Sequence, residues 1–166
     1  MNHRKTIGVA LCALTLVAWA ATASATSLGA GIHYLHNLGD IKDDGLENDS
    51  FSLIGSIQSS GMIKFEVDVE YIFDYAGTDE AMVEPSAWAL IGGLVYGGAG
   101  IGIGHIDGEW QDHPFYALRA GLNFPLGGVG LDVFGTYRFQ KDEEFNDLTG
   151  EDLDSVTFGA ILRFGL

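Results

Sequence analysis

The sequence predicts an all-β fold of eight antiparallel strands, and three observations support it. Apolar and polar residues alternate in segments of about ten residues, which is the period of a β-strand and a suitable length for a tilted membrane crossing. Eight such segments occur, so their number is even. Tight connections alternate strictly with longer acidic ones, which places all tight turns at one end. The pattern is typical of an eight-stranded antiparallel up-and-down transmembrane β-barrel.

The N-terminal segment has the composition of a secretory signal. Arg4 and Lys5 precede an apolar run over residues 7–21, and Ala23-Ser24-Ala25 supplies the small residues of a cleavage site. A lasting transmembrane helix is the alternative, but the run is short for a bilayer span. We therefore expect a cleaved signal peptide over residues 1–25 and one β-barrel domain over residues 26–166.

Removal of the signal peptide leaves an acidic chain without cysteine. Of the eight basic residues, Arg4 and Lys5 are lost, so six remain against 23 acidic ones, a net charge of −17 with neutral histidines. Such a chain repels nucleic acid, and we expect no nucleic-acid partner. The single cysteine, Cys12, lies in the signal peptide, so the mature chain has neither a disulfide nor a thiolate metal site.

The predicted strands follow the alternation and end at turn residues. Glycines at alternate positions over residues 98–104 mark one face of a strand, so we interpret residues 87–106 as a hairpin that turns at Gly97-Gly98. The predicted strands are Leu28–His36, Phe51–Ser59, Met62–Asp74, Ala87–Tyr96, Ala99–Ile106, Phe115–Pro125, Val129–Gln140 and Ser155–Leu166. The tight connections are 59–61, 97–98 and 126–128, and the longer acidic ones are 36–50, 75–86, 107–114 and 141–154.

One face of the predicted barrel gathers polar side chains. In the third strand, charged residues alternate with Phe65, Val67 and Val69, and the same parity extends into the other strands. A narrow lumen tolerates charges only when they are paired, and here four basic residues balance four acidic ones. We interpret the set as a structural ion-pair network rather than a catalytic or conducting one. Its predicted members are Lys64, Glu66, Asp68, Glu70, Arg119, Asp132, Arg138 and Arg163.

Aromatic residues concentrate on the opposite, apolar face near the strand ends. Two aromatic girdles around an aliphatic belt are expected where a barrel meets both membrane interfaces. The alternative is a soluble, lipocalin-like periplasmic barrel that binds a ligand, which would have to pack these rings inside. The predicted loop-side girdle is Tyr34, Phe51, Tyr71, Phe73, Trp88, Tyr116, Tyr137, Phe139 and Phe158, and the turn-side girdle is Phe65, Tyr96, Phe124 and Phe164.

In its predicted signal peptide, eight strands, tight turns and long loops, the chain resembles the small outer-membrane barrels of the OmpA-like and OmpX-like type. The resemblance implies a monomer in the bacterial outer membrane, with N- and C-termini periplasmic and long loops extracellular. It also implies contact with outer-membrane lipid and lipopolysaccharide, and insertion by the barrel-assembly machinery. In such families the last strand carries an assembly signal, although Leu166 stands here where phenylalanine is usual. The corresponding residues are Phe158, Leu162, Phe164 and Leu166.

An eight-stranded barrel encloses only enough space for side chains, so we expect no open diffusion pore. The expected role is structural or surface-interacting, with acidic loops facing outward, no cofactor and no catalytic residues. An outer-membrane lipid-modifying enzyme is the alternative, because the resemblance includes enzymes with a histidine, a serine and an acid at the outer rim. The rim candidates are His36, Ser50, Ser86, His105, Asp107 and His113.

Two long loops are rich in carboxylates, which hard cations prefer. However, Lys42 stands where an EF-hand needs an oxygen ligand. We therefore interpret these carboxylates as solvated charge with weak divalent-cation bridging to lipopolysaccharide, and we predict no discrete metal site. Trp110 and Phe145 are candidate contacts for a partner or a lipid head group. The candidate loop cation contacts are Asp40, Asp43, Asp44, Glu47, Asp49, Asp142, Glu143, Glu144 and Asp147.

Overall fold

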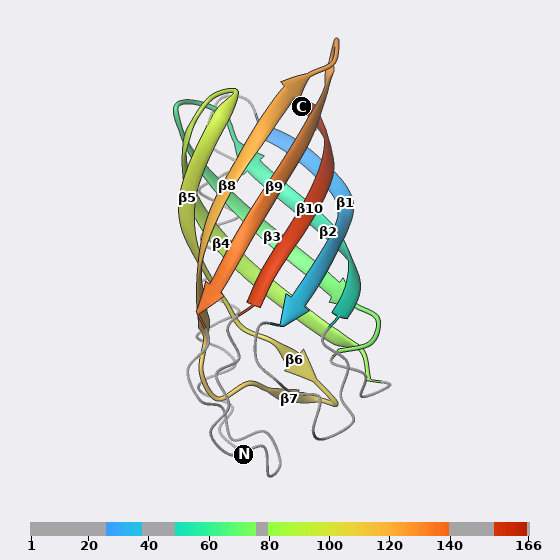
Figure 1. The fold of residues 1–166 in the computed structure, drawn as a ribbon. Coiled ribbons are helices and arrows are strands. Elements are labelled where there is room, and N and C mark those ends of the chain that lie inside the picture. Colours follow the sequence, from blue (N-terminus) through green and yellow to red (C-terminus); the bar gives the residue numbers. More distant parts are fainter. Residues whose placement is uncertain (1–25, 38–48, 76–79, 140–154, 166) are drawn as a thin grey trace.

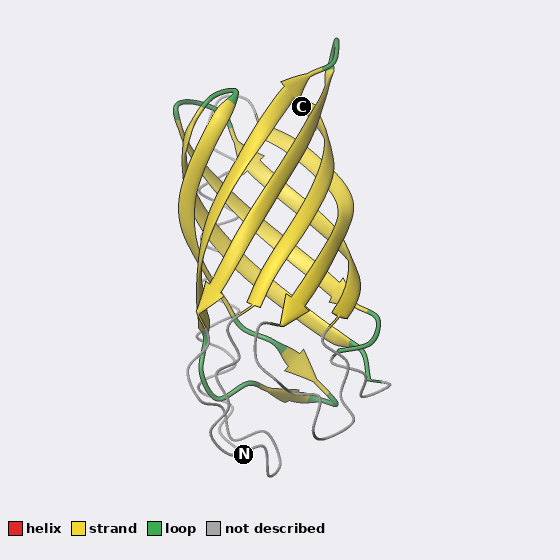
Figure 2. Cartoon of the chain, in the orientation of Figure 1, coloured by secondary structure: helices red, strands yellow, loops and turns green. Residues whose placement is uncertain are grey.

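The computed structural model describes residues 26–37, 49–75, 80–139 and 155–165, so the predicted signal peptide lies outside the described residues. Figures 1 and 2 show these residues as strands joined by short connections. Within them, no helix is long and apolar enough to cross a membrane. The strands are β1 (Thr26–Asn37), β2 (Asp49–Ser59), β3 (Ile63–Ile72), β4 (Met82–Gly92), β5 (Val95–Gly102), β6 (His105–Ile106), β7 (Glu109–Trp110), β8 (Phe115–Pro125), β9 (Val129–Phe139) and β10 (Ser155–Gly165).

Eight long strands form a closed antiparallel barrel. Their hydrogen-bonded order is β3-β2-β1-β10-β9-β8-β5-β4, and an additional pairing of β3 with β4 closes the sheet on itself. Closure removes the exposed sheet edges at which other chains could pair. The predicted eight-stranded antiparallel barrel is therefore confirmed (Figure 1).

The two ends of the barrel differ. Tight turns join β2 to β3, β4 to β5 and β8 to β9, and we call this the turn end (upper end in Figure 1). Gly61, Gly127 and Gly128 adopt positive φ there, which glycine does at low cost. At the opposite, loop end, β6 pairs with the first residues of β4 and forms a small hairpin with β7. Asp107 and Gly108 turn this hairpin, both at positive φ.

The hairpin of β4 and β5 turns four residues earlier than predicted. Its turn lies at Gly93-Leu94, directly after Gly92, rather than at Gly97-Gly98, and Gly97 is instead a strand residue paired with Ile91. Gly92 has a φ of 129°, and a Cβ there would collide with the carbonyl oxygen of Val95. Its N–H donates to the carbonyl of Met62. The backbone therefore selects the earlier glycine, and β4 begins at Met82, inside the predicted loop 75–86.

The outward face of the barrel is apolar. Large aliphatic side chains such as Leu53, Leu118 and Leu162 are 51%, 53% and 45% exposed, although they lie in strands. Aromatic residues pair at the loop end, with ring centroids 4.8 to 5.3 Å apart. These pairs are Tyr34–Phe51, Tyr71–Phe73 and Tyr137–Phe139. Phe65, Phe124 and Phe164 are exposed at the turn end.

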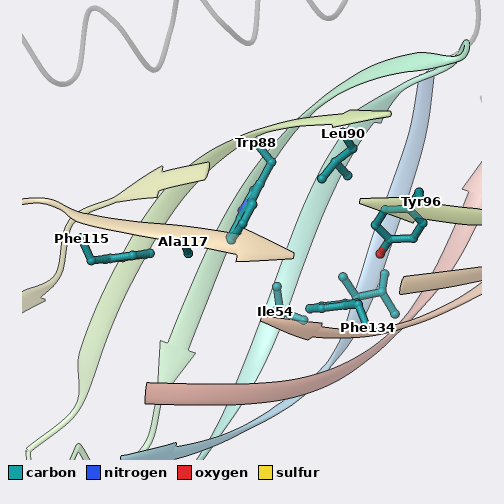
Figure 3. Packing of buried hydrophobic residues seen from close by; sticks show 8 residues of the cluster. Ile54, Trp88, Leu90, Tyr96, Phe115, Ala117 and Phe134 are labelled. Carbon is teal, nitrogen blue, oxygen red and sulfur yellow. The ribbon is translucent and has the colours of Figure 1, made fainter. Parts of the chain in front are cut away.

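Two predicted members of the girdles do not lie on this face. Trp88 and Tyr96 are buried and point into the barrel (Figure 3). Their assignment was wrong because this segment carries apolar side chains on both faces of β4, with Leu90 inside and Ala89 and Ile91 outside, and because Tyr96 lies in β5, after the turn. Alternation therefore could not fix the parity of this strand.

Candidate functional site in the barrel lumen

Part of the lumen is packed with apolar side chains. Figure 3 shows Trp88, Leu90, Tyr96, Phe115 and Phe134 directed toward one another in the interior. The remaining buried members of this cluster are Ile54, Ala117 and Ile161.

Three glycines of β5 make room for these rings. A Cβ added at Gly98 would collide with Leu90, one at Gly100 with the Trp88 indole, and one at Gly102 with the Phe115 ring. The glycines with period two therefore lie on the lumen face of their strand, opposite the largest side chains.

Five charged residues form what we call the central cluster: Glu66 and Asp68 from β3, Arg119 from β8, Asp132 from β9 and Arg163 from β10. Arg119 lies 3.0 Å from a carboxylate oxygen of Glu66 and 3.0 Å from one of Asp68. Arg163 lies 2.9 Å from Glu66 and 2.8 Å from Asp132. All five side chains are buried, so these pairs are largely shielded from solvent screening.

Neutral groups add hydrogen bonds to the central cluster, and of its carboxylate oxygens Asp68 Oδ1 alone is buried without a hydrogen-bond partner among the described residues. The Tyr96 hydroxyl donates to Asp132 over 2.7 Å, and the Gln58 amide donates to Glu66. Arg163 donates to the Ser56 hydroxyl over 2.7 Å. Such bonds are what make buried charge tolerable, because a carboxylate that loses water needs several donors.

The Arg119 guanidinium also lies between two aromatic rings. Its Cζ is 3.8 Å from the Trp88 ring centroid and 4.2 Å from that of Phe134. A planar cation stacked on ring faces gains cation–π attraction, and more so away from water. Arg119 is therefore one of the side chains at which the apolar and charged parts of the lumen meet.

A second group of charges lies nearer the loop end, and we call it the loop-side cluster: His33 from β1, Glu70 from β3, Glu84 from β4 and Arg138 from β9. Arg138 pairs with Glu84 and its Cζ lies 3.9 Å from the Phe115 ring centroid. His33 Nδ1 lies 3.0 Å from one carboxylate oxygen of Glu70. The other oxygen of Glu70 accepts a hydrogen bond from the Ser52 hydroxyl. Glu70 and Glu84 are direct cross-strand neighbours.

The structure brings seven of the eight predicted network residues into these two clusters. The eighth, Lys64, forms no ion pair with any described residue, and its ammonium lies 5.6 Å from the Tyr96 ring centroid. Two members of the loop-side cluster were not predicted from the sequence. Glu84 fell in a predicted loop, and His33 was not assigned to the polar face although it has the right parity in its strand.

Glu84 changes the charge balance of the polar face. The predicted set carried four acidic and four basic residues, and the structure adds one buried acid. The face therefore carries one negative charge more than its lysine and arginines neutralise, and the predicted balance of zero is wrong.

The rim candidates for catalysis are split between the two faces. His36 lies on the outward side, 2.6 Å from Asp49, which also accepts a hydrogen bond from Tyr34. Ser50 is buried on the lumen side and donates to the carbonyl of Asp74. Ser86 accepts a bond from the Trp88 indole. The remaining candidates lie in or beside the β6–β7 hairpin: His105 contacts Trp110 edge-on, Asp107 is in the turn of the hairpin, and His113 follows the hairpin.

Of the candidate loop cation contacts, only Asp49 lies among the described residues. Phe145 and Leu166 also fall outside them, whereas Phe158, Leu162 and Phe164 lie on the outward face of β10. Within the described ranges, no group of three or more His, Cys, Asp or Glu side chains is arranged to hold a metal ion.

A closed eight-stranded barrel with an apolar exterior and a filled, ion-paired interior defines a class, the small outer-membrane β-barrels. The structure is similar to that of Neisserial surface protein A (NspA), with a TM-score of 0.63 and 15% identity over 85% of this chain and 98% of that one. It is also similar to the outer membrane protein OprG from Pseudomonas aeruginosa, with a TM-score of 0.56 and 11% identity over 87% of this chain and 96% of that one. No protein-family model matches the sequence, and no curated protein matches it by sequence. The chain therefore has the fold of the small outer-membrane barrels.

Proposed function

We propose that the mature protein spans the bacterial outer membrane as a closed barrel with a structural or surface-interaction role. The observation that carries this proposal is the reversed polarity of the barrel: large apolar side chains are exposed outside, while Arg119, Glu66 and Asp68 are at most 3% exposed inside. A soluble ligand-binding barrel would place its apolar side chains inward. The filled lumen supports a platform rather than a pore.

The proposed orientation follows from the two ends of the barrel. Thr26 and Gly165 lie at the turn end, so both termini would face the periplasm with the tight turns. The longer loops would then face outward and contact lipopolysaccharide and other surface components. Insertion would use the barrel-assembly machinery, for which Phe158, Leu162 and Phe164 supply an alternating apolar strand face.

Two measurements test the location and the fold together. The full chain is expressed in a Gram-negative host, the membranes are fractionated, and the detergent extract is run on a gel before and after boiling. We expect the protein in the outer-membrane fraction with a mobility that changes on boiling, as a closed barrel resists detergent until heated. A protein that remains folded in the soluble periplasmic fraction would contradict the proposal.

A lipid-modifying enzyme is the competing function, and the split placement of His36 and Ser50 disfavours it. Lipid A isolated from cells with and without the protein should therefore have the same acylation and phosphorylation pattern. A new lipid A species that disappears in a His36→Ala variant would instead establish catalysis at the rim.

A further inference from the structure

The two charge clusters of the lumen differ in how their carboxylates are paired. In the central cluster, each of the three carboxylates lies within ion-pair distance of Arg119 or Arg163. In the loop-side cluster, Arg138 alone faces both Glu70 and Glu84. The loop-side cluster therefore carries one negative charge in excess when His33 is neutral.

The loop-side cluster also contains polar atoms without partners among the described residues. These atoms are both ring nitrogens of His33, Nε of Arg138 and Oγ1 of Thr157. His33 Nδ1 lies 3.0 Å from Glu70 Oε2. Thr157 is diagonal to His33 across the β1–β10 ladder and diagonal to Arg138 across the β10–β9 ladder. Thr157 therefore lies on the lumen wall between the positions of His33 and Arg138, and each of the three side chains is at most 4% exposed.

Excess buried charge can be compensated by a bound proton, and unpaired buried polar atoms can be compensated by a buried water. A bound proton neutralises a carboxylate or charges the imidazole, and a buried water both donates to and accepts from neighbouring groups. Each Nε–H donor of an arginine needs an acceptor, which a bare metal cation does not provide. The chemistry of the patch thus favours water and a proton over a metal ion.

We propose that His33, Glu70, Glu84 and Arg138, with Thr157, form a buried hydrated site that binds one proton. The proton belongs to the pair of carboxylates rather than to a single residue, because Glu70 and Glu84 are direct cross-strand neighbours that share one arginine. The groups that face the site are Ser52 of β2, Asp68 of β3, Phe115 of β8, Phe134 of β9 and Tyr75 beyond β3. The folded barrel then binds one proton more than the unfolded chain once an unfolded histidine has lost its own, above about pH 6.5.

The test is urea unfolding of the full-length protein, extracted in nonionic detergent, at a series of values from about pH 6 to about pH 9. With one extra proton in the folded state, the unfolding equilibrium constant should rise by up to about tenfold per pH unit, so stability falls as pH rises. Glu84→Gln removes the excess charge with little change of shape, so this dependence should flatten. Glu109→Gln, an exposed substitution on β7 with the same charge change, should keep the wild-type slope.

Each outcome decides the proposal. Equal slopes for wild type and Glu84→Gln would overturn it, as would a wild-type stability that does not change over this range. If Glu84→Gln does not fold, Glu70→Gln serves instead: it leaves Arg138 with one carboxylate and should also flatten the slope. A Glu70→Gln variant with the wild-type slope would exclude the site.

Discussion

At the scale of single residues, Arg119 joins the two parts of the lumen. It pairs with Glu66 and Asp68 and stacks between Trp88 and Phe134. An uncompensated buried carboxylate is far more costly than the pair is stabilising, because the remaining partner has lost its water. Removing Arg119 should therefore destabilise the barrel mainly because Glu66 and Asp68 would lose a buried cation, and less because the ion-pair attraction itself is lost.

We expect Arg119→Met to lower the free energy of unfolding by about 3–5 kcal/mol, since two buried carboxylates lose their shared cation. Lys64→Met is the control, because Lys64 forms only a cation–π contact and its loss should cost about 1 kcal/mol or less. Urea unfolding in detergent measures both. Equal losses for the two variants would show that the ion pairs of Arg119 are not what stabilises the lumen.

At the scale of elements, alternation predicts a strand well when the two faces differ in polarity. The bounds of β8 agree with the prediction at both ends, and those of β9 and β10 agree over every residue that the structure describes. In β3 the charged residues mark the lumen face without ambiguity, so Glu66, Asp68 and Glu70 could be assigned to it from sequence alone.

The hairpin of β4 and β5 could not be predicted in this way. Trp88 and Leu90 face inward while Ala89 and Ile91 face outward, so the second half of β4 has no polar side chain to mark the lumen. Two Gly-Gly pairs compete for the turn, at 92–93 and at 97–98, and only tertiary packing distinguishes them. The position of Glu84 follows from that choice, which is why the excess lumen charge was missed.

The packing of this hairpin makes a specific prediction. Gly100→Ala should lower the free energy of unfolding by about 1–3 kcal/mol, because the added methyl group collides with the Trp88 indole in a filled lumen. Gly93→Ala places the same methyl in open space at the turn and should be close to neutral. Thermal unfolding followed by band mobility on a gel compares the two. A neutral Gly100→Ala would mean that Trp88 can move aside.

At the scale of the whole molecule, the barrel inverts the polarity of a soluble protein. The exterior carries the aliphatic belt and aromatic pairs, and the interior carries the charges. Alternate residues of each strand face the polar lumen and the exterior. A charge placed on the outward face should therefore lower the free energy of unfolding substantially only if lipid covers that face.

Val133 lies near the middle of β9 and faces outward. In a membrane, Val133→Arg should cost about 2–4 kcal/mol at mid-bilayer depth, whereas Met62→Arg at the turn end should cost about 1 kcal/mol or less. Refolding into phospholipid vesicles and urea titration would measure the difference. Similar stabilities for the two variants would argue against a lipid-covered exterior.

The positions of two indoles give the barrel its own optical probes. Trp88 is 5% exposed inside the lumen, and Trp110 is 40% exposed on the β6–β7 hairpin. Aqueous iodide should therefore quench the fluorescence of Trp110 strongly and that of Trp88 hardly at all while the barrel is closed. In a Trp110→Phe variant without the first 25 residues, the emission comes from Trp88 alone. The emission spectrum of Trp88 then reports the closing of the lumen during folding and is not affected by motion of the β6–β7 hairpin.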